Sequence, residues 1–315
     1  MKRALIAVAA MLVILAIVTG VYYTVDSSQR REALQTGGTV VDTSVGPVEY
    51  QLVGNNPEQT LLFFHGTPGG YDQGIGALDD AQVLTLSRPG YLGTPLEVGT
   101  TPGDQAQAAA AVLDKLGIAE VTVMGASGGG PAAYTFAARY PERTLALVGM
   151  EAISHSTAKD EVGLPDSDFL FWLMIQSLVL TQDDAGVVAQ IAQNESDREQ
   201  LAKQPDKQKQ VAGMIWSMWP PSMRKVGFDN DFTQFKKLNL PLESVRAPTL
   251  IVHGTLDQSV PFEHAEYALA RVPNAQLHAI EGAGHMMPFA HEDEVNAAVT
   301  TFLAGIQSQP PGRSP

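Results

Sequence analysis

One short run of small residues surrounds a serine in the way that is typical of a catalytic nucleophile. The run Gly125-Ala126-Ser127-Gly128-Gly129 fits the pattern G-x-S-x-G. In that pattern the serine sits on a sharp turn between a strand and a helix, where only small neighbours fit. The apolar stretch VTVMG, which ends at the first glycine, predicts a strand, and PAAYTFAARY predicts a helix. We therefore expect the Ser127 hydroxyl to be exposed at the carboxyl end of a buried strand.

An aspartate and a histidine later in the chain could activate this serine. A serine hydroxyl is a poor nucleophile until a base takes its proton and a third group holds that base in place. Asp257 follows the predicted strand PTLIVHG, and His285 follows the predicted strand AQLHAI. Because both would lie at the same sheet edge as Ser127, we expect His285 to be the general base and Asp257 to be its acid partner.

A glycine-rich loop could stabilise the negative charge of a reaction intermediate. The loop HGTPGG follows the apolar run TLLFF, and its glycines would let backbone N–H groups approach a substrate oxygen closely. We assign the two donors of an oxyanion hole to the N–H groups of Thr67 and Gly128, because Pro68 has no N–H to donate. We expect His65 to hold the loop through hydrogen bonds and not to act as a second base.

The elements that must position these residues alternate along the chain. Strands are expected at 39–45, 48–54, 60–64, 82–87, 121–125, 144–150, 248–254 and 275–280, and helices at 103–117, 128–140, 261–271 and 291–305. Apolar strands that alternate with helices predict an α/β fold, in which a mostly parallel sheet lies between helix layers. The predicted core consists of residues 39–151 and 247–305.

Residues 152–246 interrupt this alternation and are predicted to form an inserted helical cap. All three tryptophans of the chain, Trp172, Trp216 and Trp219, lie in this segment. We expect part of its aromatic residues to form the core of the cap and the rest to face an apolar cleft beneath it.

The amino terminus carries an apolar stretch that is long enough to cross a membrane. Residues 4–25 would form a helix about 33 Å long, and a bilayer core is roughly 30 Å thick. We favour an anchor over a cleavable signal segment, because no A-x-A site follows the stretch. Lys2 and Arg3 favour an inside amino terminus, so the catalytic domain would lie outside the cytoplasm, or would be exported if residues 1–25 were cleaved. Residues 26–38 are interpreted as a polar spacer and 306–315 as a disordered tail.

The composition excludes several classes of protein. The chain has 315 residues, and 20 basic against 34 acidic side chains give a formal charge of −14. Such a chain lacks the clusters of cations that bind nucleic acids. It contains no cysteine, which excludes disulfides, thiolate metal sites and a cysteine nucleophile. Its histidines follow no zinc-binding pattern, so we expect no metal.

Five motifs together resemble the serine hydrolases of the α/β-hydrolase fold. They are HGTPGG, SRPGY, GASGGGP, HGTLDQSVP and GAGHMMP, each after its strand, and the resemblance covers about residues 39–305. It implies an eight-stranded sheet, the triad Ser127, His285 and Asp257, oxyanion donors at Thr67 and Gly128, and no cofactor. The expected activity is that of a carboxylic ester hydrolase, with amides less favoured. An apolar cap and the net negative charge favour a small, largely apolar substrate.

Three alternatives remain open at this point. Glu151 follows the strand TLALVGM, a position from which related folds occasionally recruit the acid, so it is the alternative partner of the histidine. HGTPGG and SRPGY also resemble proline iminopeptidases, although those enzymes usually have tryptophan after the serine, where this chain has Gly128. Such an aminopeptidase needs a cap carboxylate for the substrate amine; Glu195, Asp197 and Glu199 are available, but we expect these helix charges to be solvated. The third alternative is a ligand receptor with an intact triad and very slow turnover.

Overall fold

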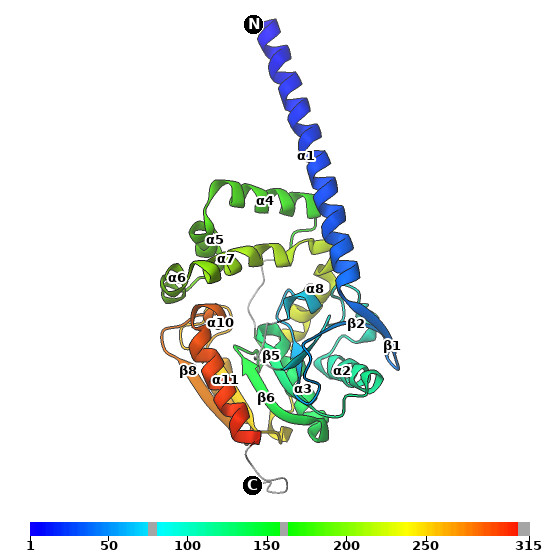
Figure 1. Cartoon of the computed structure of the whole chain (residues 1–315), viewed down its shortest axis with the longest axis vertical. Helices are drawn as coiled ribbons and strands as arrows, with labels where there is room; N and C mark the ends of the chain where they lie inside the picture. Colours follow the sequence, from blue (N-terminus) through cyan, green and yellow to red (C-terminus); the bar gives the residue numbers. More distant parts are fainter. Residues whose placement is uncertain (75–80, 158–162, 308–315) are drawn as a thin grey trace.

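Eight strands form one sheet at the centre of the protein, which the computed structural model describes over residues 1–74, 81–157 and 163–307 (Figure 1). In chain order they are β1 (Thr39–Thr43), β2 (Gly46–Val53), β3 (Thr60–Phe64), β4 (Gln82–Leu86), β5 (Val121–Ala126), β6 (Thr144–Met150), β7 (Thr249–Gly254) and β8 (Ala275–Ile280). Across the sheet the order is β1-β2-β4-β3-β5-β6-β7-β8. Strands β3 to β8 are parallel, whereas β2 pairs antiparallel with β1 and β4. The predicted α/β class with a mostly parallel eight-stranded sheet is confirmed.

Helices flank this sheet, four of them where the sequence predicts them. They are α2 (Pro102–Leu116), α3 (Gly130–Arg139), α9 (Glu263–Leu269), α10 (Met287–Ala290) and α11 (Glu292–Gln307). Local sequence explains the bounds of α2, because Thr101 and Asp104 form a capping box at its start and Gly117 ends it in the left-handed conformation. The four-residue helix α10 is the one core helix that we do not predict, because it is too short to show helical periodicity.

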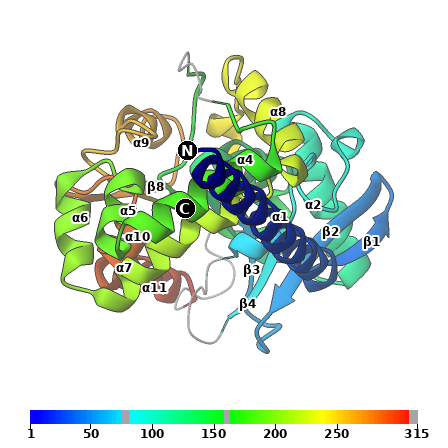
Figure 2. The ribbon, with the colours of Figure 1, turned by 90° about the horizontal axis from the view of Figure 1, so that it is seen from above.

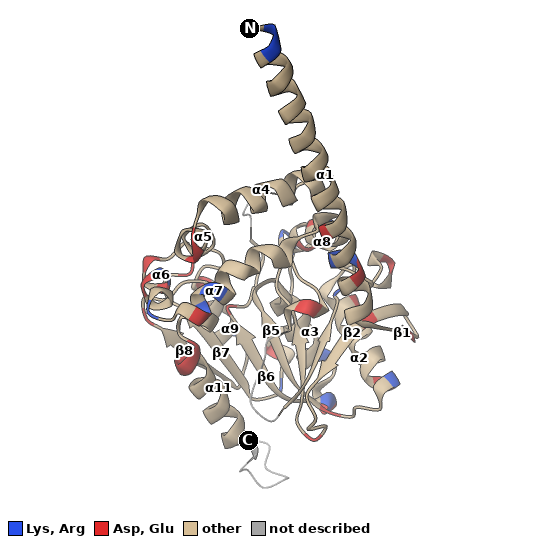
Figure 3. Cartoon of the chain, turned by 45° about the horizontal axis from the view of Figure 1, so that its top comes forward, with Lys and Arg blue, Asp and Glu red and all other residues tan. Residues whose placement is uncertain are grey.

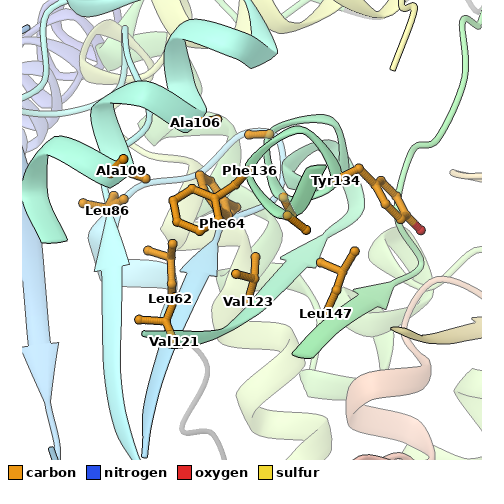
Figure 4. Packing of buried hydrophobic residues seen from close by; sticks show 14 of the residues in the cluster. Leu62, Phe64, Leu86, Ala106, Ala109, Val121, Val123, Tyr134, Phe136 and Leu147 are labelled. Carbon is orange, nitrogen blue, oxygen red and sulfur yellow. The ribbon is translucent and has the colours of Figure 1, made fainter. Parts of the chain in front are cut away.

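Alternate residues of β3 explain why both faces of the sheet are covered. Leu62 and Phe64 join an apolar cluster with residues of α2, α3 and α9. Leu61 and Phe63 join the cluster on the opposite face, to which α11 contributes. Figure 4 shows Phe64 and Leu62 below Phe136 of α3. Burial of one such side chain contributes roughly 1.5–3 kcal/mol, so the two clusters fix the sheet and with it the position of every strand end.

Between β6 and β7, the described residues of the inserted segment form five α-helices. They are α4 (Asp168–Thr181), α5 (Asp184–Ile191), α6 (Glu195–Ala202), α7 (Pro205–Gly213) and α8 (Lys225–Phe235). Ser167, Asp183 and Asn194 cap α4, α5 and α6 through their side chains. Trp172 and Trp219 are buried in an apolar cluster of these helices, and Trp216 packs against it. The tryptophans therefore contribute to the core of the cap.

The first helix, α1 (Lys2–Gly37), extends away from this body (Figure 1). It is the one helix in the described ranges that is long and apolar enough to cross a membrane, and no residue of its most apolar stretch is buried in the body. In Figure 3 the ribbon of α1 carries no colour of a charged residue between the basic residues at its start and the charged residues near the body.

The lower end of α1 is packed against the body. The helix includes residues 26–37, so most of the segment that we interpret as a polar spacer is helical. Leu34 is buried, Arg30 pairs with Asp72, and Arg31 pairs with Asp168. Some of the polar residues in this segment form ion pairs with the body. Hydrophobic periodicity in the sequence does not indicate such pairs. Of the predicted tail, residues 308–315 lie outside the described residues.

Candidate active site

Ser127 lies on the predicted turn between a strand and a helix. It follows β5 directly and begins a single 3₁₀ turn, Ser127–Gly129, which leads into α3. Its φ is +49°, a backbone conformation that non-glycine residues rarely adopt. A Cβ atom at Gly125 would lie 2.5 Å from the Ala133 Cβ, and one at Gly129 would lie 2.2 Å from the Phe64 carbonyl oxygen. The glycines of the motif are therefore required by this tight turn.

Four neighbouring strands end at the edge where Ser127 lies. Ser127 follows β5, Glu151 follows β6, Asp257 follows β7 and His285 follows β8, and these strands are adjacent in the sheet. The topology thus brings residues together that are up to 158 positions apart in the chain (285 − 127). This edge, the carboxyl end of a parallel sheet, is where ligands bind in such folds.

Asp257 and His285 are joined by a hydrogen bond. Nδ1 of His285 lies 2.7 Å from Oδ2 of Asp257. The other carboxylate oxygen of Asp257 accepts the N–H groups of Ser259 and Val260 at 2.8 and 2.9 Å. The Asp257 side chain has no exposed surface, whereas that of His285 is 20% exposed. A fixed, buried carboxylate therefore orients an imidazole that remains accessible.

The surroundings shift the pKa values of both groups in opposite directions. Burial lowers the pKa of His285, but the hydrogen bond to Asp257 and the negative charges of Asp257, Glu151 and Asp197 outweigh burial and raise this pKa above 6.5. Burial raises the pKa of Asp257, but its interactions with His285 and with the Val260 N–H outweigh burial and lower it below 3.8. Both shifts favour an ionised carboxylate beside an imidazole that accepts a proton readily.

The Ser127 hydroxyl makes no hydrogen bond within the described ranges. The structure brings Asp257 and His285 into contact, and places Ser127 on the same edge without a hydrogen bond to His285. Such bonds are often long before substrate binds. The backbone of Ser127 is nevertheless tied to the next strand end, because its carbonyl oxygen accepts the N–H of Ile153 at 3.0 Å.

Glu151 is buried beside this pair but does not bond to the histidine. Its φ is +35°, and its Oε2 atom has no hydrogen-bond partner among the described residues. Burial raises the pKa of Glu151 to about 8, and the charge of Asp257 adds to this effect while that of His285 opposes it. Near neutral pH, Glu151 is therefore mostly protonated, which suits it less than Asp257 to hold an imidazolium ion.

The glycine-rich loop lies directly against the serine turn. A Cβ atom at Gly66 would lie 3.4 Å from the Ser127 Cβ, and one at Gly128 would lie 2.1 Å from the Thr67 Oγ1 atom. Within the described residues the Thr67 N–H donates to no protein atom. The loop that carries Thr67 is therefore packed tightly against the turn that carries Ser127 and Gly128.

Arg88 and Asp231 hold this loop in place, and neither is among the sequence candidates. Arg88 donates to the carbonyl oxygens of His65 and Gly66 at 3.0 and 3.1 Å, and forms two hydrogen bonds of 2.7 Å with Asp231. Asp231, on α8, also accepts the Thr67 hydroxyl at 2.5 Å. Arg88 belongs to the motif SRPGY, which was the one available signal, whereas nothing in the sequence indicates that Asp231 reaches back to the core.

His65 stabilises the loop, as we expect from the sequence. Its Nε2 atom accepts the Arg88 N–H at 3.0 Å, and its Nδ1 atom donates to the Gly66 carbonyl oxygen at 2.8 Å. Burial and the neighbouring Arg88 hold the pKa of His65 well below 6.5, so the imidazole is neutral. His253 is also structural, because its Nε2 atom bonds to the Val260 carbonyl oxygen at 2.8 Å.

Asp197 of the cap holds the loop that carries His285. Its two carboxylate oxygens accept the N–H groups of Gly284 and Met286 at 2.9 and 3.1 Å. Asp197 is fully buried, so our expectation of a solvated helix charge is wrong for this residue. Asp197 lies near the start of α6, which Asn194 caps. The start of this helix is packed closely on the loop of His285, because a Cβ atom at Gly284 would lie only 2.4 Å from the Cβ of Asn194. No sequence signal indicates this contact between cap and core.

A small apolar cluster lies beside the serine turn. It contains Ile153, Phe235 and Val260, with Phe232 and Leu238 packed against it. A Cβ atom at Gly128 would lie 3.0 Å from the Phe235 ring, and Ile153 and Val260 are hydrogen-bonded to Ser127 and Asp257 respectively. These side chains form an apolar surface beside Ser127 and Asp257.

Among the residues that the structure describes, one group of possible metal ligands lies outside this site. The ligand atoms of His155, Glu263 and His264 lie within 4.8 Å of one another. The two imidazole rings stack at 3.9 Å with an interplanar angle of 19°, and Nδ1 of His264 accepts the Ser154 N–H. Since stacked rings do not point their lone pairs toward a common centre, we assign no metal to this group.

A family model described as alpha/beta hydrolase fold matches residues 59–292. The match covers more than half of the chain and includes Ser127, Asp257 and His285, so the chain belongs to the α/β hydrolase fold family. A 2-hydroxy-6-oxononadienedioate/2-hydroxy-6-oxononatrienedioate hydrolase from a Pseudomonas species is 27% identical over 82% of this chain and 92% of the relative. The protein is accordingly a hydrolase of the α/β class.

Solved structures agree with this assignment. An alpha/beta hydrolase fold protein from Nakamurella multipartita superposes with a TM-score of 0.74 at 30% identity, over 86% of this chain and 100% of that one. A membrane phospholipase A superposes with a TM-score of 0.60 over 98% of this chain and 100% of that one. At 19% identity, the latter likeness shows the fold alone.

Proposed function

We propose that the protein is a serine hydrolase that cleaves carboxylic esters of small, largely apolar substrates. The observation that carries this proposal is the hydrogen-bonded pair Asp257 and His285 at the same sheet edge as Ser127, which has φ +49° on its turn. A strained serine, an oriented imidazole and a buried carboxylate are the parts that acyl transfer through a covalent intermediate requires. Amides are a less favoured substrate of the same site.

The proposed cycle has two halves that mirror each other. The Ser127 oxygen attacks the ester carbonyl carbon while Nε2 of His285 accepts the serine proton, and the N–H groups of Thr67 and Gly128 stabilise the oxyanion. The carbon–oxygen bond to the alcohol breaks, and the alcohol leaves with the proton from His285. Water then attacks the acyl group with His285 as base, which releases the acid and returns the hydroxyl to Ser127. Asp257 stabilises the imidazolium in both halves.

The residues around the serine support an uncharged substrate. Ile153, Phe235 and Val260 form an apolar surface next to Ser127 and Asp257. The guanidinium of Arg88, which lies behind the oxyanion loop, is already paired with Asp231 and is buried. A substrate with an apolar acyl or alcohol group gains free energy from such a surface, whereas a polyanion would meet a protein with a formal charge of −14.

The contacts of the cap do not favour the aminopeptidase alternative. A substrate amine would need a free carboxylate, but both oxygens of Asp197 accept backbone N–H groups, and Glu195 is exposed to solvent. The names of the relatives agree with hydrolysis in general and do not indicate which type of bond this protein cleaves.

We also propose that residues 4–25 anchor the protein in a membrane with the catalytic domain outside the cytoplasm. The support is the length of α1 and its exposed apolar part. The likeness to the membrane phospholipase A extends over 98% of this chain and therefore includes α1. Because the end of this helix is packed on the body through Leu34 and Arg31, the anchor and the catalytic domain would move as one unit.

Steady-state hydrolysis of p-nitrophenyl acetate, butyrate and octanoate tests the catalytic proposal. We expect turnover of all three esters, and a loss of at least about 10⁴-fold in Ser127→Ala. Ser44→Ala, which changes an exposed serine in the turn between β1 and β2, should leave the rates unchanged. Prolyl-naphthylamide serves as the peptidase substrate, and faster cleavage of it than of the esters would favour the aminopeptidase. Turnover at or below about one event per hour for every ester would instead favour the receptor alternative.

A further inference from the structure

The cap helix α4 presents an unusual apolar surface to solvent. Its 14 residues, DFLFWLMIQSLVLT, contain one charged side chain, Asp168 at the first position. One face is buried in the cap through Phe171, Trp172 and Ile175. The opposite face carries exposed large apolar side chains, namely Leu170, Leu173, Met174 and Leu180. Contiguous apolar surface of this kind marks a binding surface in a folded protein.

The first part of α4 contacts the long helix α1 through Asp168, Phe169 and Trp172. Figure 1 shows α4 running across the top of the cap from α1, with the apolar part of α1 continuing beyond it, and Figure 2 shows the same two helices together from above. The contact is specific, because the Trp172 indole N–H donates to Asp26 at 2.6 Å and Arg31 pairs with Asp168. The orientation of α4 is therefore tied to that of α1.

Aromatic contacts place α4 at one level along α1. The ring of Tyr23 packs edge-on against Phe169 and Trp172, with centroids 5.0 and 5.4 Å apart, and Tyr22 also packs against Trp172. Tyr22 and Tyr23 lie near the end of the apolar stretch of residues 4–25, where the chain would leave the bilayer. Tyrosine and tryptophan are enriched at this depth, because their rings are apolar and their polar groups reach water.

We propose that the exposed face of α4 inserts into the surface of the lipid bilayer that α1 spans. This inference rests on the proposed membrane anchor and adds a second contact between protein and lipid. An apolar helix at a membrane surface buries its side chains about 5–10 Å deep at the boundary between headgroups and acyl chains. The exposures of Leu180, Leu170 and Met174, which are 81%, 62% and 53%, then reflect contact with lipid and not with water. With α1 and α4 both bound, the cap side of the catalytic domain faces the membrane.

Depth-dependent quenching of a fluorophore tests this contact on the full chain. The chain has no cysteine, so Met174→Cys and Leu180→Cys each give one labelling site for the environment-sensitive dye NBD. Leu145→Cys is the control, because Leu145 is also an exposed apolar residue but lies at the start of β6, on the sheet edge opposite the cap. Ile14→Cys, in the middle of the apolar stretch of α1, reports on the anchor itself. Each labelled protein is reconstituted into phosphatidylcholine vesicles that contain doxyl-labelled lipid, and is assayed for ester hydrolysis.

We expect doxyl lipid to quench NBD at positions 174 and 180 about threefold, with little quenching at position 145. Quenching at position 14 with none at 174 and 180 would overturn the α4 contact and leave the anchor standing. No quenching at position 14 would overturn the anchor, and the α4 contact with it. A third outcome is an NBD signal at position 174 that indicates an apolar environment only at high protein density and is not quenched by doxyl lipid. This outcome would identify a second copy of the chain as the occupant of the α4 face, and it would also overturn the proposal. The rate of ester hydrolysis reports separately on the catalytic proposal.

Discussion

Nδ1 of His285 lies 2.7 Å from Oδ2 of Asp257, although 27 residues separate the two in the chain. The carboxylate is fully buried and receives two further hydrogen bonds from backbone N–H groups. It is therefore ionised and cannot rotate without losing those bonds, so the tautomer and orientation of the imidazole follow from the fold.

The acid partner can be identified by comparing two conservative substitutions. Asp257→Asn should lower kcat for ester hydrolysis by about 10⁴-fold, because an amide favours the wrong tautomer of the histidine. Glu151→Gln, which changes the other buried acid at this edge, should keep kcat within about tenfold of the unmodified protein. The reverse pattern of losses would show that Glu151 is the acid.

The pH dependence of kcat/KM reports the pKa of the base in the free protein. His285 must be neutral to accept the serine proton, and its pKa is raised above 6.5 chiefly by Asp257, which outweighs burial. Activity should therefore rise with pH, with the midpoint of the acid limb above pH 6.5. A midpoint below 6.5 would mean that burial dominates and that this carboxylate does not stabilise the imidazolium.

Asp197 should act as a positioning residue for His285. Asp197→Asn keeps the size of the side chain but replaces one acceptor oxygen with an amide that cannot accept the N–H of Gly284 or Met286. We expect kcat/KM to fall about 10- to 100-fold. The acid limb should also move to lower pH, because the charge of Asp197 helps to raise the pKa of His285.

Glu195→Gln is the matched control, because Glu195 is an exposed acid on the same helix. It should change neither the rate nor the pH profile. If Asp197→Asn lowers the rate but leaves the acid limb in place, the residue supports the fold of the cap without acting on the histidine.

The buried pair of Arg88 and Asp231 should stabilise the whole protein. In Asp231→Asn the guanidinium of Arg88 stays buried without its counter-charge, so the free energy of unfolding should fall by about 3–5 kcal/mol. Asp229→Asn is the control on the same helix, because Asp229 pairs with Lys225 at the surface and should contribute less than about 1 kcal/mol. Thermal unfolding in detergent measures both, and equal effects of the two substitutions would refute a special role for the buried pair.

The raised pKa of Glu151 predicts a loss of stability in alkaline solution. Folding raises this pKa from 4.5 to about 8, chiefly through burial, so the folded protein holds the proton more tightly than the unfolded chain. The associated stability is fully present below pH 4.5 and is lost as the pH rises to about 8. Between pH 6 and pH 9 the unmodified protein should lose about 3 kcal/mol relative to Glu151→Gln, measured as unfolding free energies in detergent. A pH-independent difference between the two proteins would contradict the raised pKa.

The sequence predicts the elements of the core because each carries a local signal. The strands are short apolar runs, α2 has a capping box and a terminal glycine, and the small residues around Ser127 permit one kind of turn. Asp257 and His285 can be assigned because parallel strands end at one edge, so their positions in the chain determine their positions in space.

Contacts between the cap and the core could not be predicted in the same way. Asp197 and Asp231 are ordinary acidic positions on helices, and their burial depends on how α6 and α8 pack on the core. The polar segment after residue 25 continues α1 because Arg30 and Arg31 find partners far along the chain. Such pairings depend on tertiary structure. Neither the hydrophobic periodicity nor the amino-acid composition of a segment indicates which distant residues it will contact.

Isolation of the acyl-enzyme tests the central claim most directly. The protein is mixed with p-nitrophenyl butyrate, quenched in acid within the first turnovers, digested and analysed by mass spectrometry. The account predicts one butyryl group on the peptide that contains Ser127, and none in Ser127→Ala, which should also lack turnover. A Ser127→Ala protein that still hydrolyses the ester at the unmodified rate, with no acylated peptide in either protein, would contradict the account.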